Sequence, residues 1–327
     1  MNMYILSEAQ FDQITKAVEA AHFALLTCQR IDLDLTSPKQ TIPLPAGEKL
    51  VRTSDVRKPK SQSKTRKSSR KGQRGVAVLT EAIRSGLSLV SGLHRKLTEE
   101  SELVKAADAS GQQLIDIRVP PASIPIATGR QRSGKRLLMV GTDCCVGKKY
   151  SALSLHKALQ ERGVAATFRA TGQTGILISG GGIPMDAVVS DFLSGAAEML
   201  TPDAGPDHWD VIEGQGSLFH PAYAAVTLGL LHGSQPDAMV LCHGSGRKVI
   251  DEYEDYPVPD LRECVAQYEQ AARVTNGLSS IVGISLNTEG LSDDEALGVC
   301  RDASTLTGLP CVDPMRHALD SILDALL

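Results

Sequence analysis

A glycine-bounded turn near the middle of the chain contains the residue types that bind phosphate. An apolar segment ends at Val140, the turn closes with Gly147 and Lys148, and a helix-prone stretch follows. In this arrangement backbone N–H groups, a lysine and the positive end of a helix dipole all face one anion. We therefore predict a phosphate-binding loop. Its residues are Gly141, Thr142, Asp143, Cys144, Cys145, Val146, Gly147, Lys148 and Lys149.

This loop differs from the loop of enzymes that hydrolyse nucleoside triphosphates. Five residues, where the common pattern has four, separate the two glycines. Lys149 occupies the position at which a serine or threonine normally binds Mg²⁺. A second lysine suits a ligand whose phosphates are held in place. The sequence therefore favours phosphate binding over magnesium-dependent phosphoryl transfer, and it predicts no metal site.

Other polar residues follow neighbouring apolar segments and supply acid–base and anion-binding groups. Carboxylates and imidazoles can remove a proton, and an arginine can bind a carboxylate through two hydrogen bonds. The residues considered for the catalytic base are Glu213, His220, His243 and Asp143. The residues considered for substrate binding are Arg169, Thr171, Gln173, Thr174, Ser217 and Arg247. A solvated carboxylate or an ordinary strand-end histidine is the alternative interpretation.

A regular alternation of strands and helices is expected to position these residues. Beyond residue 133, apolar segments alternate with helix-prone stretches, which predicts an α/β fold with a doubly wound, mainly parallel sheet. The carboxyl ends of such strands lie along one edge, where ligands bind. The candidate residues follow these ends. The predicted strands are 136–140, 164–169, 209–212, 238–242, 280–286 and 309–312.

The chain divides by composition into two predicted domains. A P-loop domain covers 134–327, and a smaller, atypical α/β domain covers 1–133, where two helix-then-strand patterns follow residue 75. Within 52–74, ten lysines and arginines face a single acid, Asp55, with few apolar residues. This composition is typical of a disordered segment, and a polyanion-binding arm is the alternative.

The overall composition limits the class of protein. Hydrophobic residues at 42% and charged residues at 22% are globular values. No apolar run reaches the roughly 18 residues of a membrane span, and no secretory signal precedes the first domain, so we expect a cytoplasmic protein. An aromatic content of 4% disfavours nucleic-acid partners. The sequence favours a small-molecule substrate and leaves homo-oligomer formation open.

Five motifs resemble the D-glutamate N-acetyltransferase (DgcN-type) family, P-loop proteins formerly of unknown function. They occur in the order GTDCCVGKKY, FRATGQTGILISG, DHWDVIEGQGSLFHP, QPDAMVLCH and VGISLNT. The resemblance covers 75–327, and the chain departs from the family over 1–74. The loop and EGQGS also resemble, more distantly, the dethiobiotin synthetase group.

The resemblance implies transfer of an acetyl group from acetyl-CoA to the amino group of D-glutamate, a step of D-amino acid catabolism. The coenzyme would place its diphosphate at Gly147 and Lys148, and Arg169 or Arg247 would bind the glutamate carboxylates. Ser217 or backbone N–H groups would stabilise the oxyanion. Two alternatives are an ATP- and Mg²⁺-dependent ligase or kinase of the dethiobiotin synthetase type, and a non-catalytic nucleotide-binding protein.

Overall fold

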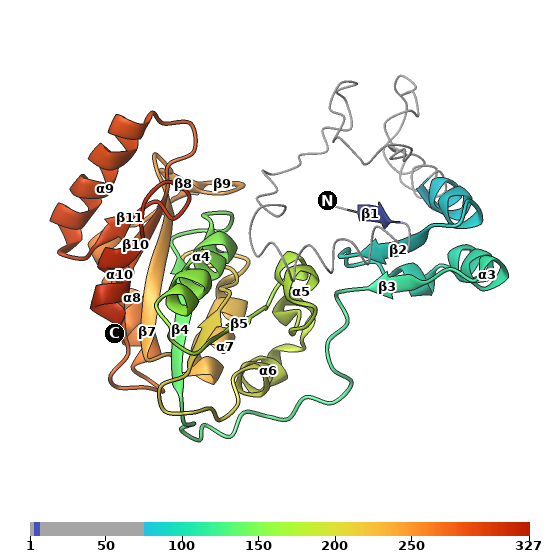
Figure 1. Ribbon diagram of the computed structural model, residues 1–327, viewed down its shortest axis with the longest axis horizontal. Coiled ribbons are helices and arrows are strands. Elements are labelled where there is room, and N and C mark those ends of the chain that lie inside the picture. The colour runs from blue at the N-terminus through green and yellow to red at the C-terminus, as the bar shows by residue number, and fades with distance from the viewer. Residues whose placement is uncertain (1–2, 7–74) are drawn as a thin grey trace. The chain divides into compact units, whose positions relative to one another are not determined.

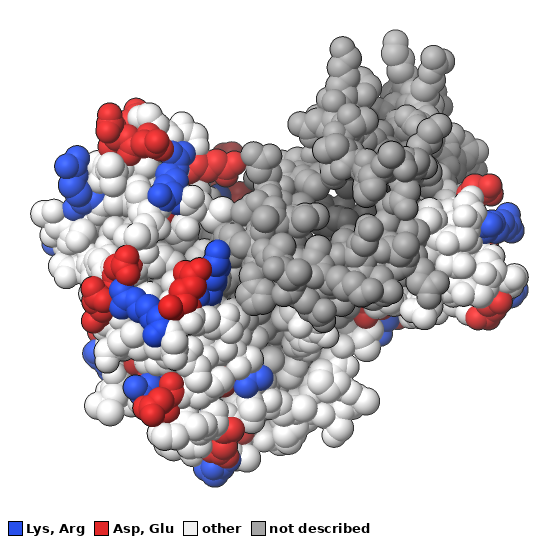
Figure 2. All heavy atoms as spheres, viewed as in Figure 1, with Lys and Arg blue, Asp and Glu red and all other residues white. Residues whose placement is uncertain are grey.

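The chain forms two compact units, Met1–Val119 and Pro120–Leu327. The computed structural model describes residues 3–6 and 75–327, so the basic stretch 52–74 lies outside the described residues. None of the helices in these two ranges is both long and apolar enough to cross a membrane. On the face shown in Figure 2, acidic and basic side chains of the second unit are interspersed.

A six-stranded parallel sheet forms the centre of the second unit. Its spatial order is β11-β10-β7-β4-β6-β5, and every neighbouring pair runs parallel. The strands are β4 (Lys135–Gly141), β5 (Ala166–Arg169), β6 (Trp209–Ile212), β7 (Ala238–Gly244), β10 (Ser280–Asn287) and β11 (Cys311–Val312). All six predicted strands and the doubly wound α/β class are confirmed. Because the chain leaves β4 in one direction and later returns to its other side, the end of β4 is a topological switch point.

Helices cover both faces of this sheet (Figure 1). One face packs against α4 (Lys148–Glu161) and α10 (Asp320–Leu326). The other packs against α6 (Leu193–Leu200), α7 (Ala224–Ser234) and α8 (Leu261–Ala272). The remaining elements are α5 (Gln173–Ser179), α9 (Asp293–Thr307), the 3₁₀ turns η3 (Met185–Ala187) and η4 (Ser190–Phe192), and the hairpin of β8 (Val249–Ile250) with β9 (Tyr253–Pro257).

Burial on both faces explains the apolar sequence of β4. Leu137 and Met139 pack on the α4 side, whereas Leu138 and Val140 pack on the α7 side. All four side chains are at most 2% exposed. A strand covered on both faces needs apolar residues at consecutive positions, which is typical of a parallel sheet. The strand is therefore a rigid support for the loop that follows Gly141.

The described part of the first unit is a small α/β layer. Its sheet has the order β1-β2-β3, with β1 antiparallel to β2 and β3 parallel to it. A helical segment over 75–84 and α3 pack on it through a core that includes Ile83, Leu89 and Leu103. Both predicted helix-then-strand patterns are confirmed. The elements are β1 (Met3–Leu6), β2 (Ser88–Ser91), η2 (Leu97–Glu99), α3 (Ser101–Ser110) and β3 (Leu114–Asp116).

Candidate active site at the phosphate loop

The predicted phosphate loop joins β4 directly to the first turn of α4. Gly147, at φ 97°, caps the helix, and Cys145 is left-handed at φ 56°. Left-handed non-glycine residues are uncommon and concentrate at ligand-binding turns. The Lys148 side chain lies inside the turn, where its Nζ donates to the carbonyl of Asp143 at 2.7 Å. Burial lowers the pKa of this lysine. An anion entering the loop would therefore meet a cation that has little access to water.

Asp143 connects the loop to the segment that follows β7. Its carboxylate is fully buried, and Oδ1 accepts the N–H of Cys144 at 2.6 Å. Oδ2 accepts from Arg247 Nη1 at 2.7 Å and from the N–H of Asp251 at 2.8 Å. These partners compensate the buried charge. Asp143 therefore has a structural role in the loop, and its lone pairs are poorly available to a substrate proton.

Glu213, at the end of β6, holds the start of α5. Its Oε2 accepts the N–H groups of Thr171 and Gly172, each at 3.0 Å. Thr171 also donates its hydroxyl to the Glu213 carbonyl at 2.6 Å. Burial raises the pKa of Glu213, and the two N–H bonds oppose that shift. A Cβ on Gly175 would lie 2.1 Å from Oε2, so glycine is required there. The carboxylate therefore caps the turn that carries Thr171, Gln173 and Thr174.

His220 is buried beside the loop with its tautomer set by the backbone. The N–H of Ala222 donates to His220 Nδ1 at 3.1 Å, so the neutral ring carries its proton on Nε2. One ring nitrogen, an Asp143 carboxylate oxygen and Cys144 Sγ all lie within 4.8 Å of one another. A metal ion fits this group poorly, because Nε2 is protonated and Asp143 already accepts three hydrogen bonds. His220 is therefore a hydrogen-bond donor.

His243, at the end of β7, is the predicted base that contacts a side chain of the loop. Its Nδ1 lies 2.8 Å from Thr142 Oγ1, which ties the ring to the loop. Burial lowers the pKa of His243, and the nearby charge of Arg247 lowers it further. The imidazole is therefore neutral at neutral pH and can accept a proton. When Nδ1 donates to the Thr142 hydroxyl, the lone pair of the ring is on Nε2.

The predicted substrate-binding residues fall into two groups. Arg247 contacts the loop through Asp143, and Thr171 contacts Glu213. In contrast, Arg169 Nε donates to the buried carboxylate of Asp210 at 2.7 Å. This bond holds the Arg169 side chain against the neighbouring strand β6. Ser217 is fully buried, and its hydroxyl accepts the N–H of Phe219. Arg247 is thus the predicted carboxylate ligand nearest to the loop and to His243.

Sequence reasoning missed residues that act through the tertiary structure. The buried Tyr268 hydroxyl donates to the Gly141 carbonyl at 2.7 Å and accepts the Leu218 N–H at 3.1 Å. It therefore joins α8 to the first loop residue and to the segment after β6. The ring of Tyr253, in the hairpin, also contacts His220, and this contact has no signal in the sequence because the two residues are far apart along the chain.

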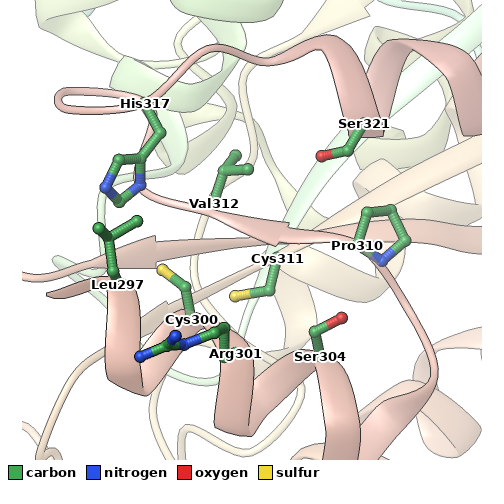
Figure 3. A pocket seen from close by; sticks show the side chains of 9 residues that line it. All are labelled: Leu297, Cys300, Arg301, Ser304, Pro310, Cys311, Val312, His317 and Ser321. Carbon is green, nitrogen blue, oxygen red and sulfur yellow. The ribbon is translucent and has the colours of Figure 1, made fainter.

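A separate pocket of about 440 Å³ lies between α9, β11 and the following turn (Figure 3). None of the predicted site residues lines it. Its lining residues are Leu297, Cys300, Arg301, Ser304, Pro310, Cys311, Val312, His317 and Ser321. The chemistry predicted from the sequence is therefore located at the phosphate loop, away from this pocket.

Comparison with known families identifies both units. The P-loop domain of unknown function DUF1611_C matches residues 125–323, and the Rossmann-like domain DUF1611_N matches residues 72–120. This chain belongs to the DUF1611 family. The P-loop fold predicted from the sequence is confirmed. The Rossmann-like match begins at residue 72, close to the end of the basic stretch.

Two curated relatives of this DUF1611 protein carry an activity in their names. A D-glutamate N-acetyltransferase of Tritonibacter scottomollicae is 50% identical over 249 residues, which cover 76% of this chain and 75% of the relative. A D-glutamate N-acetyltransferase of a Pseudoalteromonas species is 50% identical over 246 residues, covering 75% and 74%. The family resemblance expected from the five motifs is confirmed.

A solved structure shows a similar fold. The crystal structure of a DUF1611 family protein from Anabaena variabilis, at 2.30 Å resolution, superimposes with a TM-score of 0.71. It is 39% identical in sequence, and the match covers 76% of this chain and 73% of that one.

Proposed function

We propose that this protein transfers an acetyl group from acetyl-CoA to the amino group of D-glutamate. The observation that carries the proposal is the 50% identity to two relatives named D-glutamate N-acetyltransferase over three quarters of the chain. The relatives' names support an acetyltransferase, and nothing among the comparisons favours the ATP-dependent ligase or kinase. Lys149 in place of the magnesium-binding hydroxyl supports the same choice.

The phosphate loop suits the diphosphate of acetyl-CoA. Lys148 supplies a buried cation, and the first turn of the 14-residue helix α4 supplies N–H groups and the positive end of its dipole. The Asp143 carboxylate would repel an anion, but its ion pair with Arg247 at 2.7 Å offsets that charge. A bound diphosphate can replace the Asp143 carbonyl as the partner of Lys148.

His243 is proposed as the general base. Neutral His243 accepts a proton from the substrate ammonium, and the amine nitrogen then attacks the thioester carbonyl carbon. The tetrahedral intermediate collapses as the C–S bond breaks, and the coenzyme leaves as the thiolate. The attacking nitrogen loses a second proton as the intermediate collapses, so that one of the two protons released from the ammonium is taken up by the thiolate and the other passes from His243 to solvent. The products are the N-acetyl amino acid and coenzyme A. Arg247 is proposed to bind a carboxylate of the acceptor next to this base.

A thiol-release assay tests the proposal directly. The full chain is mixed with acetyl-CoA and a panel of D- and L-amino acids, with and without ATP and Mg²⁺. We expect coenzyme A release with D-glutamate and no requirement for ATP. Release only with ATP and Mg²⁺, or with another amino acid in preference to D-glutamate, would overturn the proposal.

A further inference from the structure

Three tyrosines gather beside the phosphate loop, and we refer to Tyr223, Tyr253 and Tyr256 as the aromatic wall. The rings of Tyr223 and Tyr253 lie 4.5 Å and 5.1 Å from the His220 ring. Tyr256 continues the series, with its ring 5.9 Å from that of Tyr253. The chain has six tyrosines in all. Half of them therefore meet at one place that no predicted role explains.

The aromatic wall lies next to the phosphate loop, and one hydrogen bond holds its hairpin there. His220, which lies between Tyr223 and Tyr253, has a ring nitrogen within 4.8 Å of Asp143 and Cys144. The hairpin that carries Tyr253 and Tyr256 is held through the N–H of Asp251, which donates to Asp143 Oδ2 at 2.8 Å. A ligand with its phosphates in the loop would therefore have these rings beside it.

The surface of the aromatic wall is open and its rim is acidic. Tyr223 is 52% exposed and Tyr256 is 50% exposed. Two exposed acids, Glu254 and Asp255, lie between the tyrosines of the hairpin. These carboxylates repel phosphates and the two carboxylates of glutamate. The ligand that suits the wall is an uncharged group with apolar surface for the rings and N–H donors for the acids.

The position of the aromatic wall relative to the loop determines which uncharged part of an acyl donor could reach it. Arg247 belongs to the same segment as the hairpin, and its Nε lies 3.8 Å from the position of a Cβ on Gly244, the residue after His243. Arg247 Nη1 and the N–H of Asp251 in the hairpin share Asp143 Oδ2, and the charge of Arg247 acts on His243, so the hairpin and the proposed base lie on the same side of the loop. The adenine lies beyond the diphosphate, at the other end of the donor.

We propose that the aromatic wall binds the pantetheine arm of acetyl-CoA. This inference rests on the proposed function for the identity of the donor. The rings pack against the dimethyl and methylene groups of the arm, while the acids on the rim accept its amide N–H groups. The wall would thereby direct the thioester from the loop towards His243.

Binding measurements with whole and truncated ligands test the wall. Dissociation constants are measured by calorimetry for coenzyme A and for 3′-phosphoadenosine 5′-diphosphate, which lacks the pantetheine arm. We expect Tyr256→Ala to weaken coenzyme A binding about fivefold, since it removes one ring contact, and to leave the truncated ligand unchanged. Tyr256→Phe keeps the ring and should bind as the wild type does. Leu278→Ala, an exposed position before β10, is the matched control.

Each other outcome overturns the inference in a recognisable way. Equal losses for both ligands would place the adenine on the wall, and unchanged binding of coenzyme A would mean that the wall does not contact the donor. Wild-type protein that binds coenzyme A but does not acetylate D-glutamate would overturn the proposed function. The binding measurements would then still test whether the aromatic wall contacts the pantetheine arm. Wild-type protein that binds neither ligand would overturn both.

Discussion

Two buried cations at opposite edges of the same sheet have different surroundings. Arg132, at the amino edge, donates to the Thr201 carbonyl at 2.7 Å, the Thr201 hydroxyl at 3.1 Å and the Gly233 carbonyl at 2.7 Å. At the carboxyl edge, within the described part of the chain, the Lys148 ammonium donates to one carbonyl, that of Asp143. Burial lowers the pKa of both side chains.

The number of internal hydrogen-bond partners distinguishes a structural cation from a ligand-binding one. Arg132 satisfies several acceptors of its own chain, so no ligand could compete for it without breaking the packing of α6 and α7. Lys148 has donors that a ligand could occupy, and a single carbonyl is easily exchanged for an anion. A buried charge alone therefore does not indicate function, whereas a buried charge with few internal partners does.

The largest effect is expected at the carboxyl edge, from His243→Ala. Loss of the base should lower kcat/KM about 10²–10⁴-fold. Because the pKa of His243 is lowered, wild-type activity should persist as the pH falls below the ordinary histidine range and decline only when the ring is protonated. The variant should lack this acid limb. His232→Gln, whose ring contacts the Ala271 carbonyl, is the control and should keep wild-type kinetics. An unchanged pH profile in His243→Ala would refute the assignment.

Arg132→Met should act on stability alone. The substitution leaves the buried acceptors of Thr201 and Gly233 without their donor, and we expect a loss of about 3–5 kcal/mol in the free energy of unfolding. Urea denaturation measures this loss. The KM for acetyl-CoA should stay within about twofold of wild type, because Arg132 is at the amino edge of the sheet. A large change in KM with normal stability would contradict the assignment of Arg132 as a structural cation.

Lys148→Met should show the reverse behaviour. A hydrogen bond to a charged group contributes roughly 1.5–3 kcal/mol, so the dissociation constant for coenzyme A should rise by about 10- to 100-fold. Stability should change little, since removal of a buried ammonium also removes its desolvation cost. Calorimetry with coenzyme A and urea denaturation measure the two quantities. Equal coenzyme A affinity in the variant would exclude the loop lysine from phosphate binding.

The smallest expected effect is a difference in stability between alanine substitutions at two helical glycines. Gly175→Ala should destabilise the protein by about 1–3 kcal/mol, because its Cβ would lie 2.1 Å from Glu213 Oε2. Gly298, within α9, has open space around its Cβ position, so Gly298→Ala should stabilise the protein by up to about 1 kcal/mol through helix propensity. Thermal unfolding of both variants measures the difference. The same sign for both would show that the Glu213 contact does not restrict α5.

Local sequence was sufficient to predict the elements of the second unit. The segment 136–140 is observed as Lys135–Gly141, and 238–242 as Ala238–Gly244. The predicted and observed strand lengths differ most at the end of the sheet. The strand predicted over 309–312 is observed only as Cys311–Val312, because only these two residues pair with β10. Apolar runs and turn residues are local signals, whereas the length of an edge strand depends on its partner.

The sequence by itself determined the P-loop, the alternation of strands and helices, and the edge at which polar residues would collect. These features depend on residue types within about a dozen neighbours. Only the tertiary structure decided what each polar residue does. Glu213 meets the N–H groups of Thr171 and Gly172, and Asp143 meets Arg247, across 41 to 104 residues of chain. The order of the strands brings such pairs together, and no local pattern encodes that order.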